Sequence, residues 1–180
     1  MRRSRPSSIH GHIDLQRLCR FASARLYHAP ATRIDLDQRI VYCGRRPPVA
    51  FDVLSIDTGS TPSTFGIEGA REHTIPIKPI DGFLHAITAI EEKLLTHPGV
   101  FRIVIIGGGA GGAEVCLSLH HRLSQLLKAR GENLNRVHFT LVGYSAYLLP
   151  QHAGSVRARI HRTLEQRGVK VHLFQPVIAI

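Results

Sequence analysis

Tryptophan is absent from this chain of 180 residues, and cysteine is scarce. The three cysteines, Cys19, Cys43 and Cys116, are widely separated, and no two of them form a CxxC pair. The twelve histidines include no HxxxH or HExxH pattern. These absences argue against a disulfide framework and against a zinc site, so we expect no bound metal and a reducing compartment.

The sequence also lacks a long hydrophobic run. Its longest apolar stretch, 100–106, contains Arg102 and is followed by glycines, which falls short of the roughly 18 residues that a membrane helix requires. We therefore expect a cytoplasmic protein, with a peripheral contact to the inner membrane left open.

Acidic residues are few as well, with 13 Asp and Glu against 23 Lys and Arg, and the net charge of +10 indicates an anionic partner. The arginines are spread along the chain, and the four Tyr and seven Phe form no RNA-binding aromatic motif. Nucleic acid is therefore not expected among the partners. Residues 1–13 are basic and resemble a short transit peptide in composition, but we interpret them as a basic tail.

Hydrophobic periodicity predicts alternating helices and strands along the rest of the chain. Apolar spacing predicts a helix at 14–24 with Asp14 as its N-cap, and alternating residues predict a β-hairpin at 31–43. A segment rich in proline and glycine, 61–79, is predicted to be a loop. The other predicted elements are strands at 25–28, 51–56, 101–106, 137–142 and 169–174, the start of a strand at 177–180, and helices at 81–96, 113–129 and 156–167.

A glycine-rich turn, GGGAGG at 107–112, follows the predicted strand 101–106 and opens a predicted helix. In a GxGxxG dinucleotide-binding turn each glycine has a separate physical role. We expect Gly107 to permit the tight turn, Gly109 to let a pyrophosphate approach the backbone, and Gly112 to let the helix pack closely on the strand. Backbone N–H groups at the start of the helix, together with the helix dipole, would hold the phosphates.

The order strand, glycine turn, helix, strand predicts an α/β fold with a Rossmann-like, doubly wound parallel sheet. The acid that binds the adenosine ribose in such folds is missing, because the predicted strand 137–142 is followed by Gly143. Two explanations stay open: the site accepts a 2′-phosphate beside an Arg or Lys, or it has lost tight nicotinamide binding. Glu114, two residues after the last glycine, is a further candidate residue.

Three segments in the same order resemble the pyridine nucleotide-disulfide oxidoreductases. They are FDVLSIDTGSTP at 51–62, IVIIGGGAGGAE at 103–114, and 148–169, which runs from Leu-Leu-Pro to Arg-Gly-Val. Since no redox-active cysteine pair is present, the type II NADH dehydrogenase-like branch is the most similar. Segment 72–81 is similar to a linker in the oxidoreductase module that some bacteria fuse to selenide, water dikinase.

The resemblance implies a flavoprotein whose flavin domain is interrupted by a nicotinamide domain. It implies FAD and NAD(P)H as cofactors, with hydride passing from NAD(P)H to the flavin and then to a quinone or another acceptor. It places Thr58 and Gly59 near the flavin, although Asp57 replaces the family's usual Ala there. The residues that it places near the nicotinamide cofactor are Gly107, Gly109, Gly111, Gly112 and Glu114.

The resemblance also divides the chain. Residues 1–13 form the tail, 14–80 a partial FAD-binding domain that carries the β-hairpin, and 81–180 an NAD(P)-binding domain that is truncated at its C-terminus. We therefore expect a fragment of a larger oxidoreductase. The alternative is a nucleotide-binding module without redox activity. The Thr58–Gly59 segment and the missing acid disfavour a methyltransferase that binds S-adenosylmethionine.

A first prediction concerns flavin. Residues 1–13 contain neither the strand nor the GxGxxG turn that would hold the FAD pyrophosphate, so we expect the isolated chain to purify with little or no FAD. Flavin absorbance of the protein peak after gel filtration measures this. Near-stoichiometric FAD in that peak would contradict the prediction.

Overall fold

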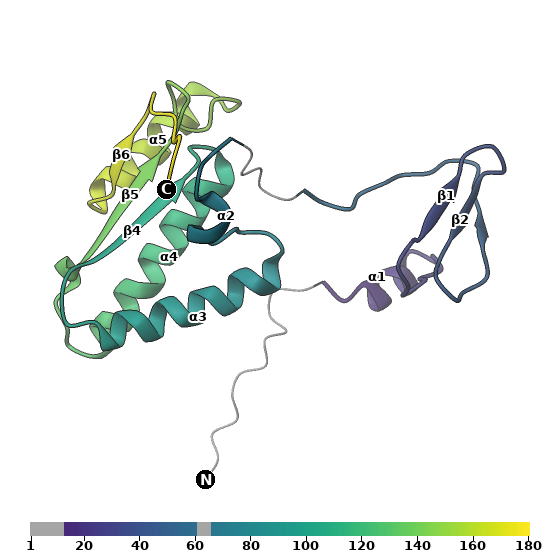
Figure 1. Cartoon of the computed structure of the whole chain (residues 1–180), viewed down its shortest axis with the longest axis horizontal. Helices are drawn as coiled ribbons and strands as arrows, with labels where there is room; N and C mark the ends of the chain where they lie inside the picture. The colour runs from purple at the N-terminus through teal and green to yellow at the C-terminus, as the bar shows by residue number, and fades with distance from the viewer. Residues whose placement is uncertain (1–12, 61–65) are drawn as a thin grey trace, which may run out of the picture. The chain divides into compact units, whose positions relative to one another are not determined.

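The computed structural model describes residues 13–60 and 66–180 (Figure 1). Contacts between residues divide the chain into two units, Met1–Thr58 and Gly59–Ile180. The basic tail expected at 1–13 lies almost entirely outside the described residues. The assignment of a flavin and a nicotinamide domain to the two sides of residue 80 stays a prediction.

The first unit begins with a short helix, α1 (Leu15–Phe21). The Asp14 side chain caps it, since Oδ1 accepts hydrogen bonds from the backbone N of Gln16 at 3.0 Å and of Arg17 at 3.2 Å. The predicted N-cap is therefore confirmed, although the helix ends earlier than expected. Its residues are exposed or half-buried, so α1 buries little apolar surface within this unit.

A small antiparallel sheet completes the first unit, in the order β1 (Arg33–Asp35), β2 (Ile40–Tyr42) and β3 (Val49–Ala50). The predicted hairpin at 31–43 is confirmed, with Ile34 opposite Val41. Its turn is fastened by the backbone N of Gln38, which donates to Asp35 Oδ1 at 2.9 Å.

The strands predicted at 25–28 and 51–56 do not form. A strand needs a hydrogen-bonded neighbouring strand. The antiparallel sheet ends with β3, whose last residue directly precedes segment 51–56, and no further strand among the described residues pairs with that segment. Val53 is 89% exposed and Ile56 is 64% exposed, so this apolar run is not buried within its own unit.

A parallel sheet forms the centre of the second unit, in the order β4 (Phe101–Ile106), β5 (Val137–Val142) and β6 (Lys170–His172). The parallel register from Phe101–Val137 to Ile106–Val142 confirms the predicted arrangement. Strand β6 is shorter than predicted because the residues just before and after it do not continue the strand. The backbone N of Val169 bonds to Leu164 at the end of the preceding helix, and Phe174 adopts a positive φ of 60°.

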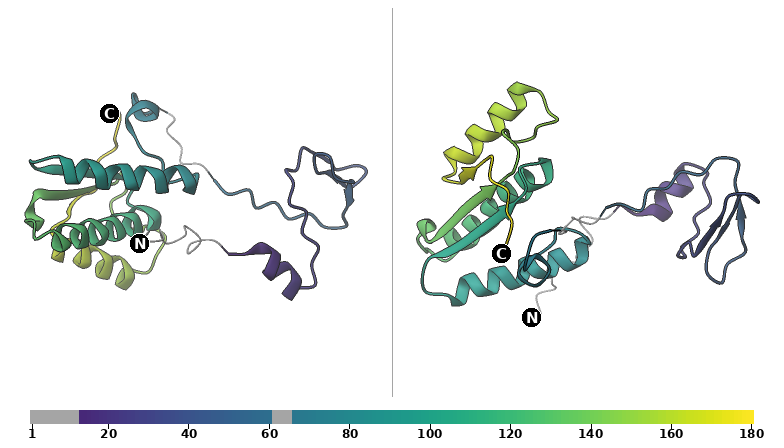
Figure 2. Two further views of the ribbon diagram at one scale, coloured as in Figure 1. Left: turned by 90° about the horizontal axis from the view of Figure 1, so that it is seen from below. Right: turned by 45° about the horizontal axis from the view of Figure 1, so that its top comes forward.

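Three helices pack against this sheet: α3 (Ile80–Thr96), α4 (Ala110–Ala129) and α5 (Gly154–Gln166). Each contributes to one apolar core that also contains Phe139 and Leu141 of β5, so the three helices cover the same face of the sheet (Figure 2). The fully buried members of this core are Leu94, Cys116, Leu123, Leu127, Leu141 and Leu164. Burial also raises the pKa of the Cys116 thiol to about 11.

Helices α4 and α5 begin earlier than their apolar spacing predicts, because the glycine, alanine and serine residues at their starts carry little hydrophobic signal. A further short helix, α2 (Ala70–His73), forms in the predicted loop 61–79, whose residues 61–65 lie outside the description. A 3-10 turn, η2 (Leu134–Arg136), leads into β5.

Side-chain contacts hold α3 in place. Glu91 of α3 forms an ion pair with Arg122 of α4. Arg136 donates to the backbone O of Leu94 at 2.7 Å and also to that of His97, so it satisfies carbonyl groups at the end of α3.

No helix within residues 13–60 and 66–180 has both the length and the apolar character to span a membrane. In the same ranges, no group of three or more His, Cys, Asp or Glu side chains is arranged to hold a metal ion.

One histidine lies against the core of the second unit. The ring of His120 on α4 packs against Phe139 with their centroids 5.2 Å apart, and its buried Nδ1 has no hydrogen-bond partner among the described residues. Burial lowers the pKa of His120 below its ordinary value of 6.5, outweighing a backbone hydrogen bond at Arg167 that raises it.

We expect this histidine to make stability depend on pH. Because its pKa is lower in the folded state, the unfolded chain binds the proton more readily, and stability decreases as the pH falls below about 6.5. Urea unfolding at pH 5.5 and 7.5, roughly one unit on each side, measures the loss. His120→Gln should reduce that loss strongly, whereas the exposed neighbour change His121→Gln should reduce it much less, because the charge of His121 is only the smallest cause of the lowered pKa. Equal losses in both variants would contradict this origin.

Candidate functional site

The glycine turn connects the end of β4 to the start of α4 at the carboxyl edge of the parallel sheet. Gly107 has φ of +120°, which residues with a side chain rarely adopt, and its backbone N donates to the O of Val142 at 2.8 Å. Gly109 is the N-cap of α4, and the N of Ala113 donates to its O at 3.1 Å. The strand, tight turn and helix expected from the sequence are all present.

Gly112 lies where the first turn of α4 crosses the end of β4. A Cβ atom at Gly112 would stand 1.9 Å from the backbone O of Gly107, far inside any permitted contact. The predicted role of Gly112 in close packing of helix on strand therefore has a direct geometric basis.

Gly109 and Gly111 are different in this respect. A Cβ at Gly109 would meet no atom within 4 Å, so the space beside its backbone is open. A Cβ at Gly111 would lie 3.5 Å from Cδ1 of Ile77, which is an ordinary contact. The protein itself therefore imposes glycine at 107 and 112 but not at 109 or 111, and a requirement at 109 would have to come from a ligand.

The start of α4 has the character of an anion site. No side chain caps it, and its first turn contains no acidic residue. The first N–H groups of any helix have no partner within that helix, and the helix dipole adds partial positive charge there. Those groups lie beside the open space at Gly109, where a phosphate oxygen can accept their hydrogen bonds.

Backbone hydrogen bonds join the loops that follow the three parallel strands. Leu149 N donates to Gly108 O at 2.8 Å, which links the loop after β5 to the glycine turn. Gly143 N donates to His172 O at 2.8 Å, and Gln175 N donates to Gly143 O at 3.1 Å. Gly143 is thus held on both sides by the segment around β6.

Gly143 lies so close to the glycine turn that a side chain at position 143 would press against Gly108. A Cβ at Gly143 would stand 3.3 Å from both Cα and N of Gly108, which is tight. An acid at this position would require a shift of a few tenths of an ångström between the two loops. The loops lie as close as they do because position 143 is glycine.

A cavity of about 160 Å³ opens beside this edge. Its lining is mostly apolar and joins the turn after β4, the loop after β5 and the C-terminal segment; it comprises Ile67, Ile106, Gly107, Val142, Gly143, Tyr144, Gln175, Pro176 and Val177. The sequence did not reveal that Ile67 and residues 175–177 belong to this wall, because they are distant in the chain from the glycine turn. A predicted strand start at 177–180 was the one available signal, and it forms an isolated bridge between Ala179 and Glu68.

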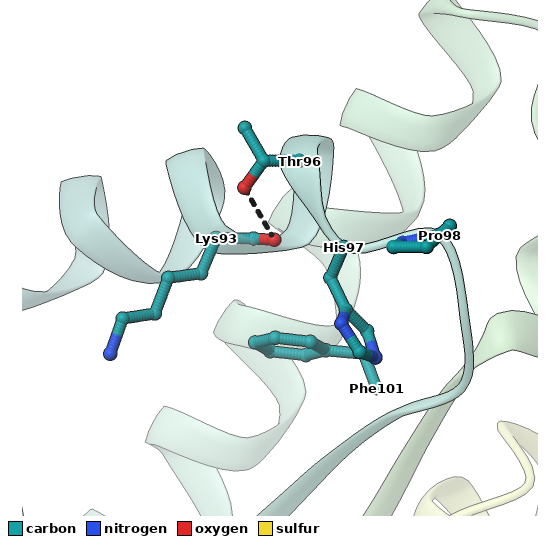
Figure 3. A pocket seen from close by; sticks show the side chains of 5 residues that line it. All are labelled: Lys93, Thr96, His97, Pro98 and Phe101. Atoms are coloured by element: carbon teal, nitrogen blue, oxygen red, sulfur yellow. Dashed lines mark hydrogen bonds between the residues drawn. The ribbon is translucent and has the colours of Figure 1, made fainter.

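A larger cavity, of about 330 Å³, lies elsewhere (Figure 3). It is lined by Lys93 and Thr96 at the end of α3, and by His97, Pro98 and Phe101. Phe101 is the first residue of β4, whereas the glycine turn follows the last residue of that strand. This cavity therefore belongs to the opposite edge of the sheet and not to the candidate site.

The remaining predicted site residues are exposed. Glu114 lies on α4, in the turn that follows Gly112. Thr58 ends the first unit and Gly59 begins the second, with a φ of +74° and no atom within 4 Å of a Cβ built there. The structure thus gathers the glycines of the turn at one edge, and the roles of Glu114, Thr58 and Gly59 toward cofactors stay predictions.

Comparison with known families identifies the chain. Residues 11–180 match the family model of pyridine nucleotide-disulphide oxidoreductases, so the chain belongs to this family. A curated relative, the type II NADH:quinone oxidoreductase of Staphylococcus aureus, is 28% identical over 158 residues, which cover 84% of this chain and 39% of the relative. The chain therefore spans well under half the length of this relative.

Solved structures agree on the fold. NDH2 from Plasmodium falciparum, solved in complex with NADH, matches 86% of this chain and 34% of its own length, with a TM-score of 0.66 at 18% identity. The sulfide:quinone oxidoreductase of Aquifex aeolicus matches 91% of this chain and 38% of its own length, with a TM-score of 0.66 at 25% identity. The parallel sheet with its small antiparallel companion is thus the fold of FAD- and NAD(P)-binding oxidoreductases.

The geometry at Gly112 generates a prediction about stability. Gly112→Ala forces Cβ against the backbone O of Gly107, so we expect a loss of at least about 2 kcal/mol in the free energy of unfolding. Gly111→Ala is the matched control, because its Cβ makes an ordinary contact and alanine favours the helix. Denaturant titration of both variants measures the difference. A Gly112→Ala variant as stable as the control would show that the helix does not lie this close to the strand.

Proposed function

We propose that this member of the pyridine nucleotide-disulphide oxidoreductase family binds NAD(P)H at the glycine turn. In our proposal it serves an FAD-dependent reaction of the type II NADH dehydrogenase kind, as part of a larger oxidoreductase. The observation that carries the proposal is the open space beside Gly109 at the uncapped start of α4, at the carboxyl edge of a parallel sheet. Nucleotides bind to that edge in open α/β sheets generally.

In this proposal the backbone holds the nucleotide. The N–H groups of the first turn of α4 donate to the pyrophosphate, which lies against the backbone of Gly109. The bare backbone at Gly109 suits a pyrophosphate, because any side chain there would occupy the same open space. The neighbouring apolar cavity, with Tyr144 on its wall, suits the adenine ring.

The redox chemistry belongs to the cofactors: bound NAD(P)H supplies a hydride and FAD accepts it. By family resemblance, Thr58 and Gly59 would lie near the flavin and Glu114 near the nicotinamide cofactor. The name of the Staphylococcus aureus relative supports a quinone as the electron acceptor, and with it a peripheral position at the inner membrane. We also keep as a proposal the similarity of segment 72–81 to the linker of the oxidoreductase module that is fused to selenide, water dikinase.

A second candidate function is a nucleotide-binding module without redox activity. The segment 51–56, which belongs to the predicted partial FAD-binding domain, forms no strand and exposes Val53 and Ile56. Its lack of regular structure favours a module that does not use flavin. Adding FAD and a soluble quinone to the purified chain separates the two. NAD(P)H oxidation that depends on both additions supports the oxidoreductase, and nucleotide binding without any oxidation supports the module.

Nucleotide binding itself is tested at Gly109. Gly109→Val puts a branched side chain into the space assigned to the pyrophosphate, so we expect NAD(P)H affinity to fall at least tenfold, or about 1.4 kcal/mol. Gly82→Val on α3 is the control, because its Cβ also meets no atom within 4 Å but lies away from the turn. Titration by nicotinamide fluorescence measures both. Equal affinities in the two variants would reject the glycine turn as the binding site.

A further inference from the structure

The larger cavity of the second unit lies at the edge of the parallel sheet opposite the glycine turn. Phe101 on its wall is the first residue of β4, so the whole length of that strand separates the cavity from Gly107. Its volume of about 330 Å³ falls within the range of about 300–1,000 Å³ in which proteins bind small molecules. The proposed nucleotide site makes no use of this cavity.

Three flat rings form much of the cavity wall. The rings of His97 and Phe101 have their centroids 6.1 Å apart and their planes inclined by 60°, and Pro98 supplies the third ring (Figure 3). A Cβ at Gly99 would stand 3.3 Å from Nε2 of His97, so the glycine lets the imidazole lie close to the backbone. Aromatic ligands gain energy when they stack offset or edge-on against such rings, so this wall favours a planar ligand.

A single ammonium group gives the cavity its charge. Lys93 is the one Lys, Arg, Asp or Glu side chain among the five lining residues. Lys93 is exposed, and it has no carboxylate within ion-pair distance in the part of the chain that the structure describes, 13–60 and 66–180. An ammonium with free N–H groups forms charge-assisted hydrogen bonds with an acidic ligand, and its one positive charge matches a carboxylate better than a doubly charged phosphate.

The end of α3 beside the cavity is also prepared for an anion. The last carbonyl groups of a helix carry partial negative charge and would repel one. Here donors occupy several of them: Arg136 donates to the O of Leu94 at 2.7 Å and to that of His97, and Thr96 Oγ1 donates to the O of Lys93 at 3.2 Å. The Lys93 ammonium therefore acts beside carbonyl groups that are already satisfied.

We propose that this cavity binds a small aromatic carboxylate, a single planar ring that carries one carboxylate group. The ring of the ligand lies against Phe101 and His97, and its carboxylate accepts hydrogen bonds from the ammonium of Lys93. Binding is reversible and non-covalent. The proposal does not depend on nucleotide binding at the glycine turn, because the two sites occupy opposite edges of the sheet.

The test uses the full chain with benzoate as the probe. Two analogues isolate the two features of the ligand, since benzamide keeps the ring without the charge and cyclohexanecarboxylate keeps the charge without the aromatic ring. We expect benzoate to bind about threefold to fivefold more tightly than either analogue in NMR titrations, which is the size of effect that one exposed ion pair produces. Intermolecular NOEs should connect the benzoate ring protons with the ring protons of Phe101 and His97.

Variants assign the charge to one residue. Lys93→Gln should weaken benzoate binding about threefold to fivefold and leave benzamide binding unchanged, whereas Lys93→Arg should retain most of the affinity for benzoate. Lys128→Gln is the matched control, because Lys128 is exposed in the last turn of α4 and does not line the cavity. Gly109→Val should also leave benzoate binding unchanged.

The outcomes separate this proposal from the proposed function. NOEs to the cavity rings, with an affinity lost in Lys93→Gln and kept in Lys128→Gln, support it. Equal binding of benzoate and benzamide, the absence of those NOEs, equal losses in both glutamine variants, or a loss in Gly109→Val overturns it. If benzoate binds as expected but NAD(P)H does not bind, the proposed function fails and this proposal stands. Thermal melting shows that each variant is folded.

Discussion

The first turn of α4 passes directly over the carbonyl group of Gly107, backbone against backbone. A single methyl group at Gly112 would collide with that oxygen at 1.9 Å. The position of α4 over the sheet, the direction of its N-terminus and the open space at Gly109 all depend on this contact. The candidate anion site is therefore a consequence of how the helix packs, and it needs no charged side chain of its own.

A second glycine contact extends this arrangement to the neighbouring loop. Gly143 approaches Gly108 so closely that a Cβ would stand 3.3 Å from its backbone, and Leu149 N bonds to Gly108 O at 2.8 Å. The loops after β4 and β5 thus meet through backbone atoms alone. Glycine at 143 lets these loops come together, and the same position carries no carboxylate.

The sequence predicts the second unit better than the first for a physical reason. Strands β4 and β5 and helix α4 bury continuous apolar faces, and the glycine turn between them has a fixed geometry, so local pattern and tertiary structure agree. The run 51–56 has the same apolar composition as a buried strand, yet no neighbouring strand pairs with it and it stays exposed. Local composition cannot reveal whether a pairing partner exists. For the same reason the cavity wall formed by residues 175–177 escaped prediction, since it depends on chain segments brought together by folding.

The two units also differ in what stabilises them. The second buries a contiguous core from β5 and three helices. In the first unit Cys43 alone among the described residues is a buried hydrophobic residue, and Phe21 and Val53 are each 89% exposed. A unit with so little buried apolar surface gains little from the hydrophobic effect and must bury those side chains against other protein or a cofactor to be stable. The glycine turn is therefore supported by the core of the second unit, whereas the first unit requires contacts beyond its own to bury these side chains.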